Sequence, residues 1–124
     1  MSALPITSIS PTQGVHAALD ELAQVDPGGL TEVGQAELLA DLKRIESRVC
    51  ALRLQVLSAA ERSKTAEKSG HADTAAWAAK HTREDGRDTS RQTKLAAGLK
   101  MQSPTQRALS TGNISQEHAE VIVD

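Results

Sequence analysis

Apolar residues recur along one stretch of the chain with the spacing of a single long helix. Within residues 31–69 they follow alternating steps of four and three, which places them on one face of an α-helix. We call these residues the heptad seam: Leu38, Leu42, Ile45, Val49, Leu52, Val56 and Ala59. No proline interrupts the stretch, and Gly70 follows it, where a left-handed residue commonly ends a helix. The pattern predicts one helix over residues 31–69, against whose seam the rest of the chain packs.

The heptad seam also has the pattern of a two-stranded coiled coil, with Leu42, Val49 and Val56 at a positions and Leu38, Ile45 and Leu52 at d positions. In a parallel, in-register dimer, Asp41 would face Glu46 and Arg48 would face Arg53. Both pairs have like charges, so we expect the seam to pack against the chain's own helices or against an antiparallel partner. Further apolar residues lie off the seam and predict contact on more than one side: Leu54, Leu57 and Ala60.

Shorter amphipathic patterns predict further helices on both sides of the long one. Their approximate ranges are 12–25, 74–80, 82–101 or 85–101, 103–111 and 115 onward. The chain of 124 residues contains no Phe or Tyr and one Trp, so Leu, Val, Ile and many Ala must fill its core. Such a composition favours close helix contacts over a sheet. We predict an all-α fold, an elongated helical bundle around one long central helix.

The two ends of the chain carry different patterns. Residues 1–12 are rich in Ser, Thr and Pro and predict a disordered leader. Residues 13–124 then form a single predicted helical domain. Its last apolar pattern is still running at Asp124, and we interpret this as a truncation at the C-terminus.

Positive charge is concentrated in one segment, although the net charge of the chain is −2. Residues 80–107 hold seven bases and three acids, whereas residues 1–79 hold seven bases and ten acids. The predicted short helix, break and longer helix over residues 74–100 have the outline of a helix-turn-helix. The candidate DNA contacts form one basic stripe at spacings of four, four and three: Arg83, Arg87, Arg91 and Lys94. Asp85 and Asp88 lie beside this stripe, so an exposed, ion-paired helix face is the alternative.

Residues that carry catalysis or bind metals are not grouped in this sequence. Cys50 is the only cysteine and suits a small apolar position that is buried or half-buried. No two of the four histidines lie three or four residues apart, and no glycine-rich phosphate loop is present. We therefore predict no catalytic residue, metal site or cofactor, and a protein that is not an enzyme. No secretion signal or membrane span is recognisable, which predicts a cytoplasmic location without membrane contact.

Several runs together resemble a known family. They are ALRLQVLSAAER at residues 51–62, SGHADTAAWAA at 69–79, LAAGL at 95–99 and GNISQEHAEVI at 112–122. Over roughly residues 38–123 the chain is similar to the domain of unknown function 222, the N-terminal helical domain of actinobacterial 13E12 repeat proteins. It departs from the family pattern at Gly86, where a better helix former is expected, and at Thr93, where an apolar residue is common.

The resemblance implies a DNA-directed protein, because such family members typically continue into an HNH endonuclease domain. Only His118 remains after Asn113, so the HNH motif is absent and no catalytic residue is carried over. A full-length relative would be an endonuclease. We predict a non-catalytic helical domain that assists binding to duplex DNA. The alternative is a helical interaction module without a nucleic-acid role, whose partner is an antiparallel second copy or another helical protein.

Overall fold

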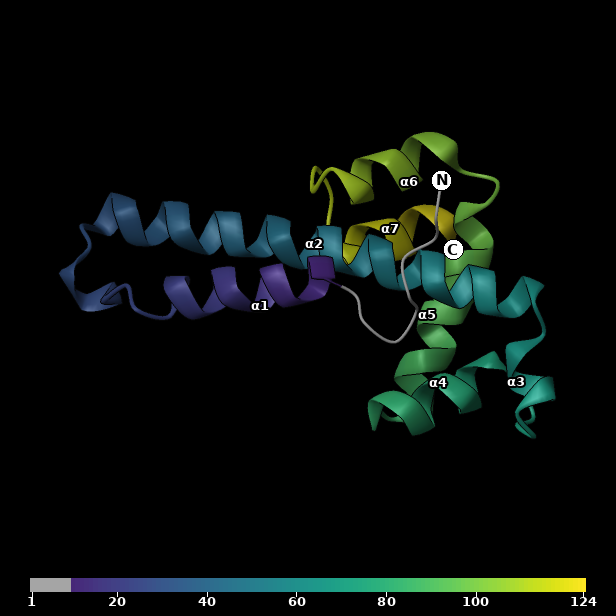
Figure 1. Cartoon of the computed structure of the whole chain (residues 1–124). Helices are drawn as coiled ribbons and strands as arrows, with labels where there is room; N and C mark the ends of the chain where they lie inside the picture. Colours follow the sequence, from purple (N-terminus) through teal and green to yellow (C-terminus); the bar gives the residue numbers. More distant parts are fainter. Residues whose placement is uncertain (1–9) are drawn as a thin grey trace, which may run out of the picture. The chain divides into compact units, whose positions relative to one another are not determined.

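The computed structural model describes residues 10–124, and this part of the chain is helical without any strand (Figure 1). Its elements are α1 (Ser10–Leu22), η1 (Pro27–Gly29), α2 (Glu32–Arg62), α3 (Thr65–Lys68), α4 (Thr74–Thr82), α5 (Gly86–Leu99), α6 (Ser103–Ser110) and α7 (Gln116–Val123). The predicted all-α class and the long central helix are confirmed. Residues 1–9 of the expected leader lie outside the described residues, while residues 10–12 belong to α1.

The chain forms two compact units, residues 1–38 and residues 39–124, where the sequence predicted one domain from residue 13 onward. The described part of the first unit holds α1, η1 and the start of α2. Its turn is a capped 3-10 helix, because the Asp26 carboxylate accepts a hydrogen bond from the Gly28 amide at 3.0 Å. The Gln35 side chain donates to the Pro27 carbonyl, also at 3.0 Å. These two bonds fix the connection from η1 into α2.

The long helix ends at Arg62, seven residues before the predicted end at residue 69. Lys64 adopts a left-handed conformation with φ 53°, which stops α2 and separates it from the single turn of α3. No apolar side chain lies between Ala60 and Ala66 to hold a straight continuation against the core. The bend instead buries Ala66 completely and lets the Thr74 hydroxyl donate to the Glu61 carboxylate at 2.6 Å. Gly70, with φ 82°, is left-handed as the sequence predicted, but it follows α3 rather than the end of the long helix.

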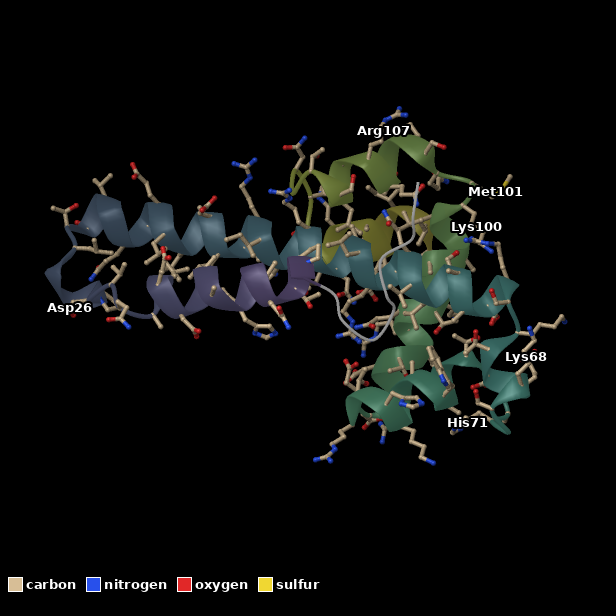
Figure 2. The ribbon with its side chains drawn as sticks, in the orientation of Figure 1. Asp26, Lys68, His71, Lys100, Met101 and Arg107 are labelled. Carbon is tan, nitrogen blue, oxygen red and sulfur yellow. The ribbon has the colours of Figure 1, made fainter. Side chains whose placement is uncertain are left out.

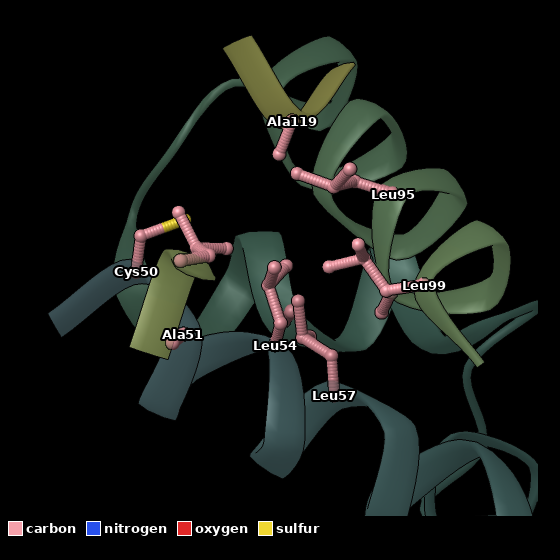
Figure 3. Packing of buried hydrophobic residues seen from close by; sticks show 10 residues of the cluster. Cys50, Ala51, Leu54, Leu57, Leu95, Leu99 and Ala119 are labelled. Atoms are coloured by element: carbon pink, nitrogen blue, oxygen red, sulfur yellow. The ribbon is translucent and has the colours of Figure 1, made fainter. Parts of the chain in front are cut away.

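The face of α2 that enters the core is not the seam but the one that holds Leu54, Leu57 and Ala60, for which the sequence predicted a second contact. Its buried residues are Ser47, Cys50, Ala51, Leu54, Leu57 and Ala60. Residues of the later helices pack against them, among them Leu95 and Leu99 of α5, Leu109 of α6 and Ala119 of α7 (Figure 3). In contrast, Val49, Leu52 and Val56 of the heptad seam are 45%, 61% and 60% exposed. The prediction that the rest of the chain packs on the seam is wrong for its second half.

The reason lies in the neighbours rather than in the spacing of α2. Small residues at Ser47, Cys50 and Ala51 allow the other helices to approach the α2 backbone closely, and the larger Leu54 and Leu57 fill the space farther along. Apart from Ala59, the seam residues are Leu, Ile and Val, whose larger side chains keep other helices farther from the α2 backbone. Two faces of α2 are therefore apolar, and the face with small residues is the one that is buried.

Most helix ends match the sequence. Asp73, Asp85 and Ser115 accept backbone hydrogen bonds as the N-caps of α4, α5 and α7. Gly112, at φ 80°, follows α6 as a left-handed residue. The start of α6 is displaced by one residue, because Gln102 rather than Ser103 is the N-cap. Met101, which lies beyond the end of α5, is 86% exposed (Figure 2).

Candidate nucleic-acid interface

Helices α4 and α5 are joined by a turn of three residues, which gives this segment the outline of a helix-turn-helix. Arg83 ends α4 in a left-handed conformation with φ 59°. Asp85 then starts α5, since its carboxylate accepts a hydrogen bond from the Arg87 amide at 2.8 Å. Gly86 is the first residue of α5, a position where a weak helix former costs little stability. The capped turn thus sets the direction in which α5 leaves α4.

A buried threonine fastens α5 to α4. Thr89 is fully buried, and its hydroxyl donates to the Ala75 carbonyl of α4 at 2.9 Å. Ala75 and Ala78 are also buried, and their small side chains let the two helices come close. Trp77 packs against the hydrophobic core, as expected for the only large aromatic residue, and its ring contacts the His81 ring at a centroid distance of 5.4 Å. The pair of helices is therefore held from its inner side, and its outer side is available for contacts.

The four predicted contact residues do not all lie on one helix. Arg83 belongs to the turn, so the stripe on α5 consists of Arg87, Arg91 and Lys94 only. The Arg87 side chain is 91% exposed and lies 4.0 Å from the Asp85 carboxylate. Lys94 is exposed and makes no ion pair within the described residues. The predicted four-residue stripe on one helix is corrected to three residues on α5 and one on the turn.

Arg91 is engaged by two carboxylates. Its guanidinium lies 3.6 Å from Asp88, one turn earlier, and 3.9 Å from Glu120 of α7. The pair with Asp88 follows from its spacing of three on a helix. The contact with Glu120 was missed, because nothing in the sequence indicates that α7 lies beside α5. Arg91 is consequently the least available cation of the stripe.

The acidic residues near the turn are also bound within the protein. Glu84 forms an ion pair with Arg53 of α2, a second contact that no sequence pattern indicated. The hydrogen bond from Arg53 lowers the pKa of the Glu84 carboxyl group, with a further contribution from Thr82. Asp85 is used as the cap of α5, and Asp88 pairs with Arg91. Each of the three acids in the predicted basic segment therefore has a local partner.

The Glu84–Arg53 pair predicts a pH dependence of stability. A carboxyl group whose pKa is lowered by folding stabilises the protein above its ordinary pKa, and this contribution is lost as the pH falls through the lowered value. We expect Glu84→Gln to reduce the free energy of unfolding at about pH 7 and to have a smaller effect at about pH 3. Urea unfolding of both proteins at the two pH values measures this.

The control for that experiment is the double variant Arg53→Gln with Glu84→Gln. At about pH 7 its free energy of unfolding should be close to that of Glu84→Gln, apart from the lost packing of the Arg53 stem. The reason is that Glu84→Gln has already removed the ion pair. If the wild-type protein exceeded Glu84→Gln in free energy of unfolding by the same amount at both pH values, the stabilising role of the Glu84–Arg53 ion pair would be contradicted.

A groove of about 550 Å³ lies between α2, α5 and α6 in the second unit. Apolar residues line it together with Gln55, Ser58, Arg62, Lys100 and Gln106. It contains no carboxylate, histidine or cysteine. Within residues 10–124, no group of three such side chains could hold a metal ion, and no helix there is long and apolar enough to cross a membrane.

Cys50 occupies a buried position in the core, as its place in the sequence predicted. Its thiol donates to the Gln116 side-chain oxygen at 3.3 Å. Burial raises the pKa of the Cys50 thiol, and the carboxylates of Glu117 and Glu120 add to this effect, while Arg53 opposes it. The thiol is therefore kept in its neutral, unreactive form.

Comparisons with known proteins identify no relative: no family model, curated protein or solved structure matches the chain.

Proposed function

We propose that this chain is a non-catalytic helical module that contacts duplex DNA through α4, the turn and α5. The observation that carries the proposal is that the acidic residues of this segment are bound within the protein, whereas most of its basic residues remain exposed. Glu84, Asp85 and Asp88 are engaged by Arg53, by the helix cap and by Arg91. Exposed bases remain on the outer side: Lys80, Arg83, Arg87 and Lys94. Phosphate oxygens are the partners that such bases favour.

The geometry of the segment suggests a role for each base. In a helix-turn-helix the first residues of the second helix approach the base edges of the major groove. Arg87 is the second residue of α5 and is highly exposed, so it is the candidate for reading a guanine. Arg83 on the turn and Lys94 farther along α5 would contact the phosphate backbone. The resemblance to 13E12 repeat proteins adds that such contacts help a nuclease module to hold DNA.

A titration with labelled duplex DNA at several salt concentrations tests this proposal. We expect the affinity of the wild-type protein to fall steeply with salt, because each phosphate contact adds about 0.9 to the slope of log K against log salt. Combining Arg87→Glu with Lys94→Glu should weaken binding at least about tenfold and reduce that slope by about 1, because Lys94 is the phosphate contact of the two.

The matched control combines Lys68→Glu with Arg107→Glu, which changes the net charge by the same amount. Lys68 lies on α3 and Arg107 on α6, both outside the proposed interface (Figure 2). Their replacement should leave most of the affinity and the slope in place. Equal losses in both double variants, or no binding by the wild-type protein at low salt, would overturn the proposal.

The second candidate function is the interaction module without a nucleic-acid role. The exposed apolar residues Val49, Leu52 and Val56 favour it, because a row of apolar side chains on a helix commonly marks a protein contact. The two functions use different faces and are separable by mutation. If the chain contacts DNA through α4, the turn and α5, substitutions on the seam should leave its DNA affinity per chain unchanged.

A further inference from the structure

The second half of the heptad seam is an apolar surface that no element of its own unit covers. Val49, Leu52 and Val56 are each at least 45% exposed, and Ala59 is exposed as well. Ile45 is half-buried. These residues occupy the a and d positions of a heptad repeat, the positions that a coiled coil buries.

The structure explains why this seam remains open. Five of the buried residues of α2 occupy f, b and c positions of the same repeat, and the sixth, Ala60, is at an e position: Ser47, Cys50, Ala51, Leu54, Leu57 and Ala60. The f position lies opposite the a/d seam on a helix. Helix α2 thus packs the face with its b, c and f positions into the core of the monomer, and its a/d face points away from that core.

The charges beside the seam distinguish the possible helical partners. In an antiparallel pair, each e position faces an e position of the other helix, and each g position faces a g position. The e positions include Glu46 and Arg53, and the g positions include Asp41, Arg48 and Arg62. When Val49 of one helix lies opposite Leu52 of the other, Glu46 faces Arg53 and Asp41 faces Arg62. Both kinds of pair are attractive, and each occurs twice.

The neighbouring antiparallel registers are unfavourable. A shift by one heptad in one direction brings Glu46 opposite Glu46 and Arg48 opposite Arg48 of the other copy. A shift in the other direction brings Arg53 opposite Arg53 and Arg48 opposite Arg62. The parallel in-register arrangement also juxtaposes like charges, Asp41 with Glu46 and Arg48 with Arg53. Of these four arrangements, one alone pairs opposite charges.

We propose that the exposed seam of α2 binds a second copy of this chain as an antiparallel helix pair, with Val49 of each copy opposite Leu52 of the other. The same register sets Val56 against Ile45 and Ala59 against Leu42, so the apolar rows match along their length. Arg53 already contacts Glu84, but its guanidinium has five N–H donors and its side chain is 39% exposed. It can bind Glu46 of the second copy without releasing Glu84.

Mass measurement by light scattering over a range of concentrations tests the association. We expect the full chain to approach twice its mass of 13.1 kDa as its concentration rises. Leu52→Glu should shift the protein to the monomer, because it puts a charge in the central layer. The matched control is Val121→Glu on α7, where the valine is 75% exposed and lies off the seam. It should leave the dimer in place, and circular dichroism should find both variants folded.

Complementary charge reversals test the register. Asp41→Arg alone opposes arginine to Arg62, and Arg62→Asp alone opposes aspartate to Asp41, so each variant should dimerise at least about tenfold more weakly. An equimolar mixture of the two should recover the wild-type association, since each mixed pair again has opposite charges. Glu46→Arg should also weaken the antiparallel dimer, because it would face Arg53. In a parallel dimer it would instead relieve the repulsion with Asp41.

A chain that remains a monomer at every concentration overturns the proposal, as does a dimer that Leu52→Glu leaves intact. A dimer that Glu46→Arg strengthens, or one that the mixed reversals fail to restore, overturns the antiparallel register. None of these results depends on whether the chain binds DNA, because the seam and the α4–α5 face carry different residues.

Discussion

Replacement of Leu54 by Ala is expected to lower the free energy of unfolding by about 3 kcal/mol, within the range of roughly 2–5 kcal/mol for buried leucines. Leu54 is 4% exposed and packs in the core with Leu57 and Leu99 (Figure 3). Truncation removes its transfer free energy and leaves a cavity that close-packed neighbours fill only in part. Urea unfolding followed by circular dichroism measures the loss.

The same replacement at Leu52, two residues earlier on α2, provides the control. Leu52 is 61% exposed, so Leu52→Ala should change the free energy of unfolding by less than about 0.5 kcal/mol. The measurement belongs at low protein concentration, where association through the seam adds nothing to stability. If the two variants lost equal stability, or if Leu52→Ala lost more, the core would lie on the heptad seam after all.

Gly112→Ala is expected to cost about 2–4 kcal/mol of unfolding free energy. Gly112 has φ 80°, a conformation that a side chain destabilises by about 1–2 kcal/mol. A Cβ atom there would also lie 3.1 Å from the Arg44 carbonyl oxygen and 3.2 Å from the Arg44 Cβ. That carbonyl belongs to the middle of α2 and cannot move aside cheaply, so steric overlap adds to the conformational cost.

Gly70→Ala separates the two contributions. Gly70 has nearly the same backbone conformation, with φ 82°, but a Cβ atom would meet nothing within 4 Å. Its replacement should cost only the conformational part, about 1–2 kcal/mol. Denaturant unfolding of the two variants side by side tests whether the loop after α6 lies as close to α2 as the structure has it. Equal losses would mean that Arg44 does not constrain residue 112.

The candidate DNA interface and the candidate dimer seam are both surface features of the second unit, and each was indicated by a different pattern in the sequence. The bases of the interface were visible as a charge-rich segment, but their availability depends on ion pairs across helices, such as Arg91 with Glu120 and Arg53 with Glu84. The seam was visible as a repeat, but its exposure depends on where α5, α6 and α7 dock. In both cases the residues were predicted and their surroundings were not.

Local chemistry was enough to predict most of the elements, although not the separate helix α3. An amphipathic repeat predicted the long helix, and capping residues such as Asp73 and Ser115 marked helix starts, because an N-cap bonds to an amide only three residues away. Gly70 and Gly112 marked helix ends for an equally local reason, since a left-handed residue is cheapest when it has no Cβ. The end of α2 at Arg62 escaped prediction because Lys64 adopts that conformation without being a glycine.

By itself, therefore, the sequence determined that this protein is all-helical, where most of its helices begin and end, and which segment carries excess positive charge. Only the tertiary structure decided which apolar face of α2 is buried. The spacing of apolar residues is a property of one helix. It shows that both faces of α2 are apolar, but it does not show which of them other helices cover. Burial depends on how closely other helices can approach, and the small side chains of Ser47, Cys50 and Ala51 admit them where the bulkier seam does not.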